Sequence, residues 1–153
     1  MNLAKNWPLL HSVARRVQGG FFENDGIRLH YVTLGKGPLV VLIHGFPEFW
    51  YSWRHQIEAL SANYQVVAID QRGFNGSGKP ASTDGYRVER LVEDVAALIR
   101  HLGRKQAVIV GHDAGAWLAW HFAAAVGWVW ALRRQIERKR AVIEQQARHA
   151  AAL

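Results

Sequence analysis

The sequence AVIVGHDAGAWLAW, residues 107–120, joins three patterns in one short stretch. It opens with a run of β-branched residues, passes through a turn flanked by Gly111 and Gly115, and ends in an apolar run of helical character. A continuous apolar run is typical of a strand that is covered on both faces. The stretch therefore predicts a buried strand over residues 107–110 that turns directly into a helix.

The rest of the chain alternates between the same two kinds of segment. Apolar runs at 39–43 and 66–69 predict two more buried strands, and helical spacing predicts helices over 52–62 and 86–102, the second ended by Gly103. An alternating segment at 28–34 follows Asp25-Gly26 and predicts a strand in a hairpin with the residues around Phe21 and Phe22. This order predicts an α/β fold with a mostly parallel sheet, flanking helices and functional groups at the C-terminal strand ends.

The turn at residues 111–115 has the form Gly-x-Asp-x-Gly between strand and helix, which is the context of a nucleophile elbow. The raised residue is Asp113, so the expected chemistry is a carboxylate that attacks an electrophile and forms an ester. The loop that contains Phe46 is of the type that supplies one backbone N–H to an oxyanion hole, with the N–H of Ala114 as the other. The structural alternative is that Asp113 only caps the helix. We expect His44 to be a hydrogen-bonded packing residue rather than a base.

Three segments follow the predicted buried strands: HGFPEFWYSWRHQ at 44–56, DQRGFNGSGKP at 70–80 and GHDAGAWLAW at 111–120. Together they resemble the α/β-hydrolase superfamily, and within it the epoxide hydrolases, over about residues 17–124. The resemblance implies that Asp113 is the nucleophile and that the amides of Phe46 and Ala114 hold the oxyanion. In the family a later His, oriented by an acid, activates water. Haloalkane dehalogenases share the Asp but place Trp after it, where this chain has Ala114.

The sequence after residue 125 does not resemble the family. It predicts one long amphipathic helix over 126–153, so the expected organisation is an N-terminal segment at 1–16, a partial hydrolase core at 17–125 and this helix. The net charge of +7 lies at the two ends of the chain, and the bases and acids of residues 21–127 balance. We expect a homo-oligomer, with exchange of the C-terminal helices as one form, because that helix and the edge of the 107–110 strand lack cover.

The sequence does not identify the group that activates water, because the His that does so in the family is not recognisable in this chain. His55, His121 and His149 are candidate bases, and helical geometry turns His121 away from Asp113. A divalent metal held by imidazoles with Asp113 or Asp70 is another source of hydroxide. No further cofactor is expected. Phe49, Trp50 and Trp53 are expected to line an apolar substrate pocket, with packing as the alternative.

The sequence thus predicts a hydrolase of small apolar esters, epoxides or related electrophiles with Asp113 at its centre. The alternatives are a metal-dependent ester or phosphoester hydrolase and an inactive oligomeric fragment that acts as a binding module.

The absence of cysteine excludes thiol nucleophiles and disulfides. No signal peptide or membrane span is recognisable, so we expect a cytoplasmic protein that takes a small-molecule substrate and binds neither nucleic acid nor membrane.

Overall fold

The computed structural model describes residues 8–127 and the side chains of residues 12–127. The chain divides into two compact units, residues 1–120 and residues 121–153. In the second unit the described residues are 121–127, which are helical. The helix predicted over 126–153 lies outside the described residues apart from residues 126 and 127. His149 also lies outside them.

The first unit is built on a mixed five-stranded sheet in the order β1-β2-β4-β3-β5. The strands are β1 (Gln18–Asn24), β2 (Ile27–Leu34), β3 (Leu39–Ile43), β4 (Gln65–Ile69) and β5 (Val108–Gly111). β3 is parallel to both β4 and β5, and β2 is antiparallel to β1 and β4. The α/β class is confirmed, and the sheet is parallel where the three strands predicted to be buried meet. The strands at 39–43 and 66–69 are buried as predicted. The strand predicted over 107–110 begins instead at Val108, and none of its residues is buried, because within the described residues β5 is an edge strand that pairs with β3 alone.

The β1–β2 hairpin is closed by the two residues Asp25 and Gly26, as the sequence predicted. Both have positive φ, 52° and 72°. This is the backbone of the tight turn whose twist matches two antiparallel strands, and glycine tolerates it at low cost. The paired residues Asn24 and Ile27 fix the register of the hairpin.

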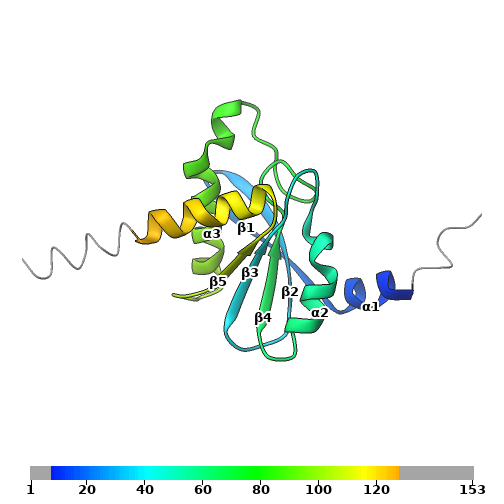
Figure 1. Cartoon of the computed structure of the whole chain (residues 1–153). Coiled ribbons are helices and arrows are strands. Elements are labelled where there is room, and N and C mark those ends of the chain that lie inside the picture. Colours follow the sequence, from blue (N-terminus) through cyan, green and yellow to red (C-terminus); the bar gives the residue numbers. More distant parts are fainter. Residues whose placement is uncertain (1–7, 128–153) are drawn as a thin grey trace, which may run out of the picture. The chain divides into compact units, whose positions relative to one another are not determined.

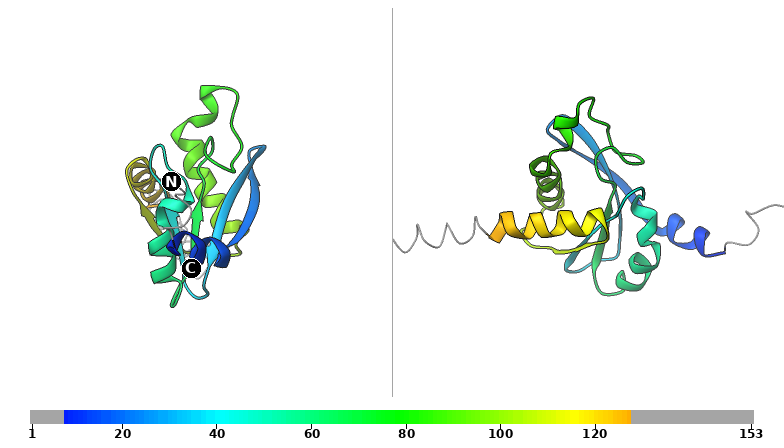
Figure 2. Two further views of the ribbon diagram at one scale, coloured as in Figure 1. Left: turned by 90° about the vertical axis from the view of Figure 1, so that its right-hand side faces the viewer. Right: turned by 45° about the horizontal axis from the view of Figure 1, so that its top comes forward.

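Helices cover both faces of the sheet (Figures 1 and 2). On one side lie α1 (Pro8–Arg16) and α2 (Arg54–Leu60), and on the other lie α3 (Val88–His101) and the helical residues 114–120. The buried cluster on the α1/α2 side joins Val13 and Ile57 to alternate residues of the strands: Val32, Val40, Leu42, Val66 and Ala68. All five residues of β3 are buried, which is the reason for its uninterrupted apolar sequence.

Two helices begin later than the sequence predicted. A 3-10 helix, Trp50–Trp53, precedes α2, and another, Thr83–Tyr86, precedes α3. Arg87, directly before α3, has an extended backbone with ψ of 147°, so the two helical segments are separate elements. The predicted helix over 86–102 is thus confirmed from residue 88, and Gly103 ends it with φ of 67°.

Candidate active site

The turn at residues 111–115 joins β5 to the following helix and raises Asp113 in a left-handed conformation. Its φ is 52°, a region that non-glycine residues rarely occupy. A Cβ on Gly111 would lie 2.2 Å from the Gly115 carbonyl oxygen, and a Cβ on Gly115 would lie 2.1 Å from the Ile43 carbonyl oxygen. Only glycine fits at either flank, so the spacing of the motif is explained by the close approach of the backbone.

The Asp113 carboxylate is held by the two amides that the sequence assigned to the oxyanion hole. The Phe46 N–H donates to Oδ1 at 3.0 Å, and the Ala114 N–H also donates to the carboxylate. These two donors lower the pKa of Asp113 below its usual value, because a backbone N–H stabilises the charged form. The side chain is exposed, so the ionised carboxylate is open to a reactant from solvent.

His44 is fully buried beneath this turn and has a structural role, as expected. The Gln71 backbone N–H donates to its Nε2 at 3.0 Å, so this nitrogen carries no proton. The ring proton is therefore on Nδ1, which donates to the Gly45 carbonyl oxygen at 2.7 Å. Burial lowers the pKa of His44, and the neutral ring fixes the position of the loop that presents the Phe46 amide.

Asp70, at the end of β4, is buried and organises the two neighbouring loops. Its carboxylate accepts hydrogen bonds from the Trp50 N–H at 2.8 Å and from Asn75 Nδ2 at 2.7 Å, and it lies 2.7 Å from His30 Nδ1. Burial alone would raise the pKa of Asp70, but these partners together hold it below its usual value. The carboxylate is fully occupied within the fold, so Asp70 does not stand free as a metal ligand.

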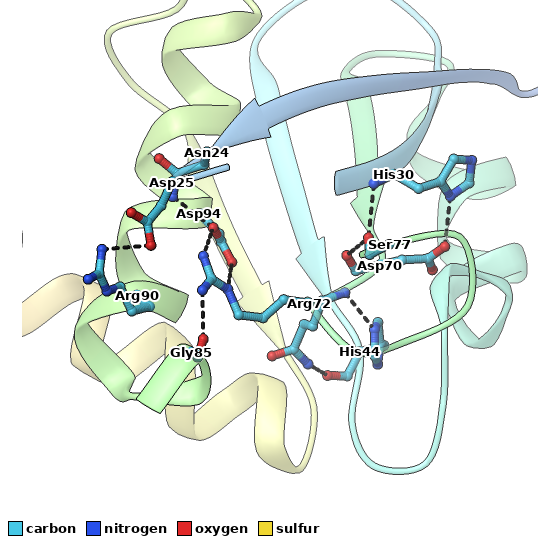
Figure 3. Close-up of polar contacts among 11 residues, drawn as sticks. Asn24, Asp25, His30, His44, Asp70, Arg72, Ser77, Gly85, Arg90 and Asp94 are labelled. Atoms are coloured by element: carbon cyan, nitrogen blue, oxygen red, sulfur yellow. Dashed lines mark hydrogen bonds and ion pairs between the residues drawn. The ribbon is translucent and has the colours of Figure 1, made fainter. Parts of the chain in front are cut away.

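The partner His30 was not identified from the sequence. It lies on β2, antiparallel to β4, and its backbone N–H donates to Ser77 Oγ, whose hydroxyl donates to the Asp70 carbonyl oxygen (Figure 3). The only available signal was the alternating pattern of the strand, which places His30 on a face without naming its partner.

A buried ion pair fixes the other side of the 70–78 loop. Arg72 donates to both carboxylate oxygens of Asp94 on α3, each at 2.6 Å, and to the Gly85 carbonyl oxygen at 2.6 Å (Figure 3). Asn24, at the end of β1, donates to the same carboxylate at 2.8 Å. The guanidinium thus joins the loop to α3 and the hairpin through paired, hydrogen-bonded charges.

The aromatic residues predicted to line a pocket lie in two environments. Trp50 and Trp53 are partly buried and pack against the core cluster on the α1/α2 side. Phe49 is exposed over 39% of its surface and stacks against Tyr51. Phe46 is 70% exposed and contacts Phe74 edge to face. Phe46 and Phe49 therefore remain available to an apolar substrate, whereas the packing of Trp50 and Trp53 supports the structural alternative for those two.

The candidate bases are not brought to Asp113 by contacts within the first unit. His55 is exposed on α2, and His121 belongs to the second unit. The imidazole next to the nucleophile is that of His112, with its Nδ1 3.6 Å from Glu48 Oε2. Glu48 Oε2 also accepts the Gly45 N–H at 3.2 Å. The pair was not predicted from the sequence, because His112 is only one position in the turn motif.

Residues 8–127 contain neither a cluster of candidate metal ligands nor a candidate membrane-spanning helix. No group of three or more His, Asp or Glu side chains comes together there as a candidate metal site. Within the same residues, no helix has the length and apolar character needed to cross a bilayer.

Residues 38–126 match the family described as alpha/beta hydrolase fold, and the chain belongs to this family. Among its relatives it is similar to epoxide hydrolases. It is 52% identical to Epoxide hydrolase 3 of Xenopus tropicalis, over 66% of this chain and 28% of the relative. It is 54% identical to Epoxide hydrolase B of Mycobacterium tuberculosis, over 64% of this chain and 29% of the relative.

The solved structures give the same picture. The fold matches that of an epoxide hydrolase from Vigna radiata with a TM-score of 0.70 and 43% identity, over 72% of this chain and 36% of that one. An epoxide hydrolase from an endophytic Streptomyces matches with a TM-score of 0.70 and 47% identity, over 72% of this chain and 34% of that one. The chain spans about a third of the length of these relatives.

Proposed function

We propose that this chain carries the nucleophile and oxyanion hole of an epoxide hydrolase, and that it forms an ester between Asp113 and a small apolar epoxide. The observation that carries the proposal is the contact between Asp113 Oδ1 and the Phe46 N–H at 3.0 Å. Because the Phe46 amide holds Oδ1, we assign the attack to the second oxygen, Oδ2. The similarity to epoxide hydrolases supports the choice of electrophile.

The first step breaks a strained ring. Asp113 Oδ2 forms a bond to a ring carbon, the carbon–oxygen bond at that carbon breaks, and the ring oxygen leaves as an alkoxide that takes a proton from water. The product is an ester of Asp113 that carries a neighbouring hydroxyl. An Asp carboxylate is ionised at neutral pH without an adjacent base, and the lowered pKa of Asp113 extends this to more acidic solution.

The second step hydrolyses the ester. Water attacks Cγ of Asp113 and loses a proton, and negative charge collects on Oδ1, where the Phe46 amide already lies. The alkyl carbon–oxygen bond stays intact while the Cγ–O bond breaks, which releases a diol and restores the carboxylate. This step needs a base, and our candidate is His112, which directly precedes Asp113 in the sequence and whose Nδ1 lies 3.6 Å from Glu48 Oε2.

Intact-protein mass spectrometry after incubation with styrene oxide tests the proposal. We expect the mass of one epoxide to be added, peptide mapping to place it on Asp113, and Asp113→Asn to remain unmodified. Diol formation beyond one equivalent would show that hydrolysis also occurs. A wild-type protein that neither carries more label nor forms more diol than Asp113→Asn would contradict the proposal.

The full exposure of Asp113 favours a second candidate, an inactive hydrolase-fold module that binds a partner. Oxyanion stabilisation is strongest where water is excluded, and here water competes for the same amides. The same labelling experiment separates the two: absence of an Asp113 adduct with epoxide, carboxylester and phosphoester probes, each with and without chelator, supports the binding module. Turnover that the chelator abolishes supports the metal-dependent alternative instead.

A further inference from the structure

A second concave site lies at the opposite end of the parallel strands from Asp113. Gln65 begins β4 and Arg104 precedes β5, whereas Asp113 follows the end of β5. The cavity that Gln65 and Arg104 help to line has a volume of about 490 Å³, within the range of small-molecule sites. Its lining comes from segments far apart in the sequence: Arg16, Gln18, Thr33, Leu34, Gly35, Lys36, Gln65 and Arg104.

The lining has three cationic side chains and includes no carboxylate. Arg16 stands at the end of α1, Lys36 in the connection between β2 and β3, and Arg104 in the connection between α3 and β5. The nearby acid is Glu58, whose Oε1 accepts a hydrogen bond from Arg16 Nη1 at 2.9 Å. These three cations come from three segments of the chain. Glu58 neutralises the charge of Arg16, so an excess of positive charge remains around the cavity.

Arg104 and Gln65, which line the cavity, have N–H groups that their hydrogen bonds to each other and to Gly37 do not use. Arg104 uses Nη2 for the Gln65 Oε1 atom at 2.8 Å and the Gly37 carbonyl oxygen at 3.3 Å, and its other N–H groups are not used in these two bonds. The same contact occupies the oxygen of the Gln65 amide, so its NH2 end is the part left to donate. A fixed guanidinium next to an oriented amide is suited to an anion with several acceptor oxygens.

We propose that this cavity binds a small organic molecule through a phosphate group held by Arg104, Lys36 and Arg16. A phosphate matches the lining better than a carboxylate because it offers three terminal oxygens and up to two negative charges, which match Lys36 and Arg104 once Arg16 is paired with Glu58. Leu34 provides an apolar wall for the organic part of the ligand. The site is separate from Asp113 and does not depend on the proposed hydrolase chemistry, so the experiment measures binding and not activity.

Titration of the full-length ¹⁵N-labelled protein with phenyl phosphate, followed by amide chemical shifts, tests the site. We expect saturable shifts of the Gly35, Lys36 and Arg104 amides, weaker binding of inorganic phosphate and of benzoate, and no binding of phenol. Absence of saturable shifts at these amides would overturn the proposal. Benzoate that binds as tightly as phenyl phosphate would overturn the assignment of a phosphate group.

Three variants that each remove one positive charge provide the matched comparison. Lys36→Gln and Arg104→Gln change the lining, whereas Lys105→Gln changes an exposed neighbour outside it. We expect the first two to weaken phenyl phosphate binding about fivefold or more, as for loss of a charge-assisted hydrogen bond, and the third to change it less than about twofold. Equal weakening by all three would show a general effect of net charge and contradict a specific site.

Discussion

The Phe46 backbone N–H lies 3.0 Å from Oδ1 of Asp113, although the two residues are 67 positions apart in the sequence. The contact joins the loop after β3 to the turn after β5, and these two strands are parallel neighbours. It orients the carboxylate and lowers its pKa at the same time.

Gly115→Ala should destabilise the protein and disrupt the elbow. The added methyl group would lie 2.1 Å from the Ile43 carbonyl oxygen, which is backbone and cannot rotate away. We expect a loss of roughly 1–3 kcal/mol or more in the free energy of unfolding, measured in urea, as for overpacking of a tight site. Gly127→Ala is the control, since nothing lies within 4 Å of its added Cβ, and it should not destabilise the protein. Equal losses in the two variants would contradict the argument from close backbone approach.

Labelling of Asp113 by an epoxide should persist in moderately acidic solution. The amides of Phe46 and Ala114 lower its pKa, so the carboxylate stays ionised at pH values at which an ordinary Asp is already partly protonated. The labelling rate, followed by mass spectrometry in the pH range in which the protein remains folded, should fall at a lower pH than the one at which an ordinary Asp titrates. A decrease centred near pH 6 would show instead that an imidazole controls the reaction.

The stability of the protein should begin to fall as the pH drops below about 6.5, before ordinary carboxylates titrate. The pKa of His44 is lower in the folded than in the unfolded state, because the ring is buried and its Nε2 accepts the Gln71 N–H. The unfolded state therefore binds the proton first, and the stability present above the unfolded pKa is lost as the pH falls toward the folded one.

His44→Gln provides the comparison for this pH dependence. The variant should be less stable at pH 7.5, because two buried hydrogen bonds change, yet its urea midpoint should vary less than that of the wild type between pH 7.5 and pH 5.5. Parallel curves for the two proteins would assign the pH dependence to another group.

We expect association through β5 if the homo-oligomer predicted from the sequence forms. Among residues 8–127, β5 pairs only with β3, and its Val108 is 55% exposed. An exposed edge strand is a template for pairing with another chain. Light scattering at micromolar concentration should give a dimer or larger species, and Val108→Lys should shift it toward monomer. Phe21→Lys, on the opposite edge strand β1, should leave the mass unchanged. A monomeric wild type would reject this mode of association.

The sequence predicted the strands that are covered on both faces because such burial leaves a continuous apolar run, as at 39–43 and 66–69. It also predicted the turn at Asp25-Gly26 and the glycines beside Asp113, since positive φ and close backbone approach restrict the residue type. Helix starts were less accurate, because the 3-10 turns at Trp50–Trp53 and Thr83–Tyr86 are built from residues that also suit an α-helix.

The sequence by itself therefore determined the fold class, the family and the residue raised at the elbow, all of which depend on local pattern and backbone geometry. The tertiary structure decided which groups meet. It paired His30 with Asp70, placed the Arg72 guanidinium on Asp94, packed Trp50 and Trp53 against the core, and gathered three cations around one cavity. These contacts join residues on different strands and helices, and no local pattern records them because each depends on how the whole sheet assembles.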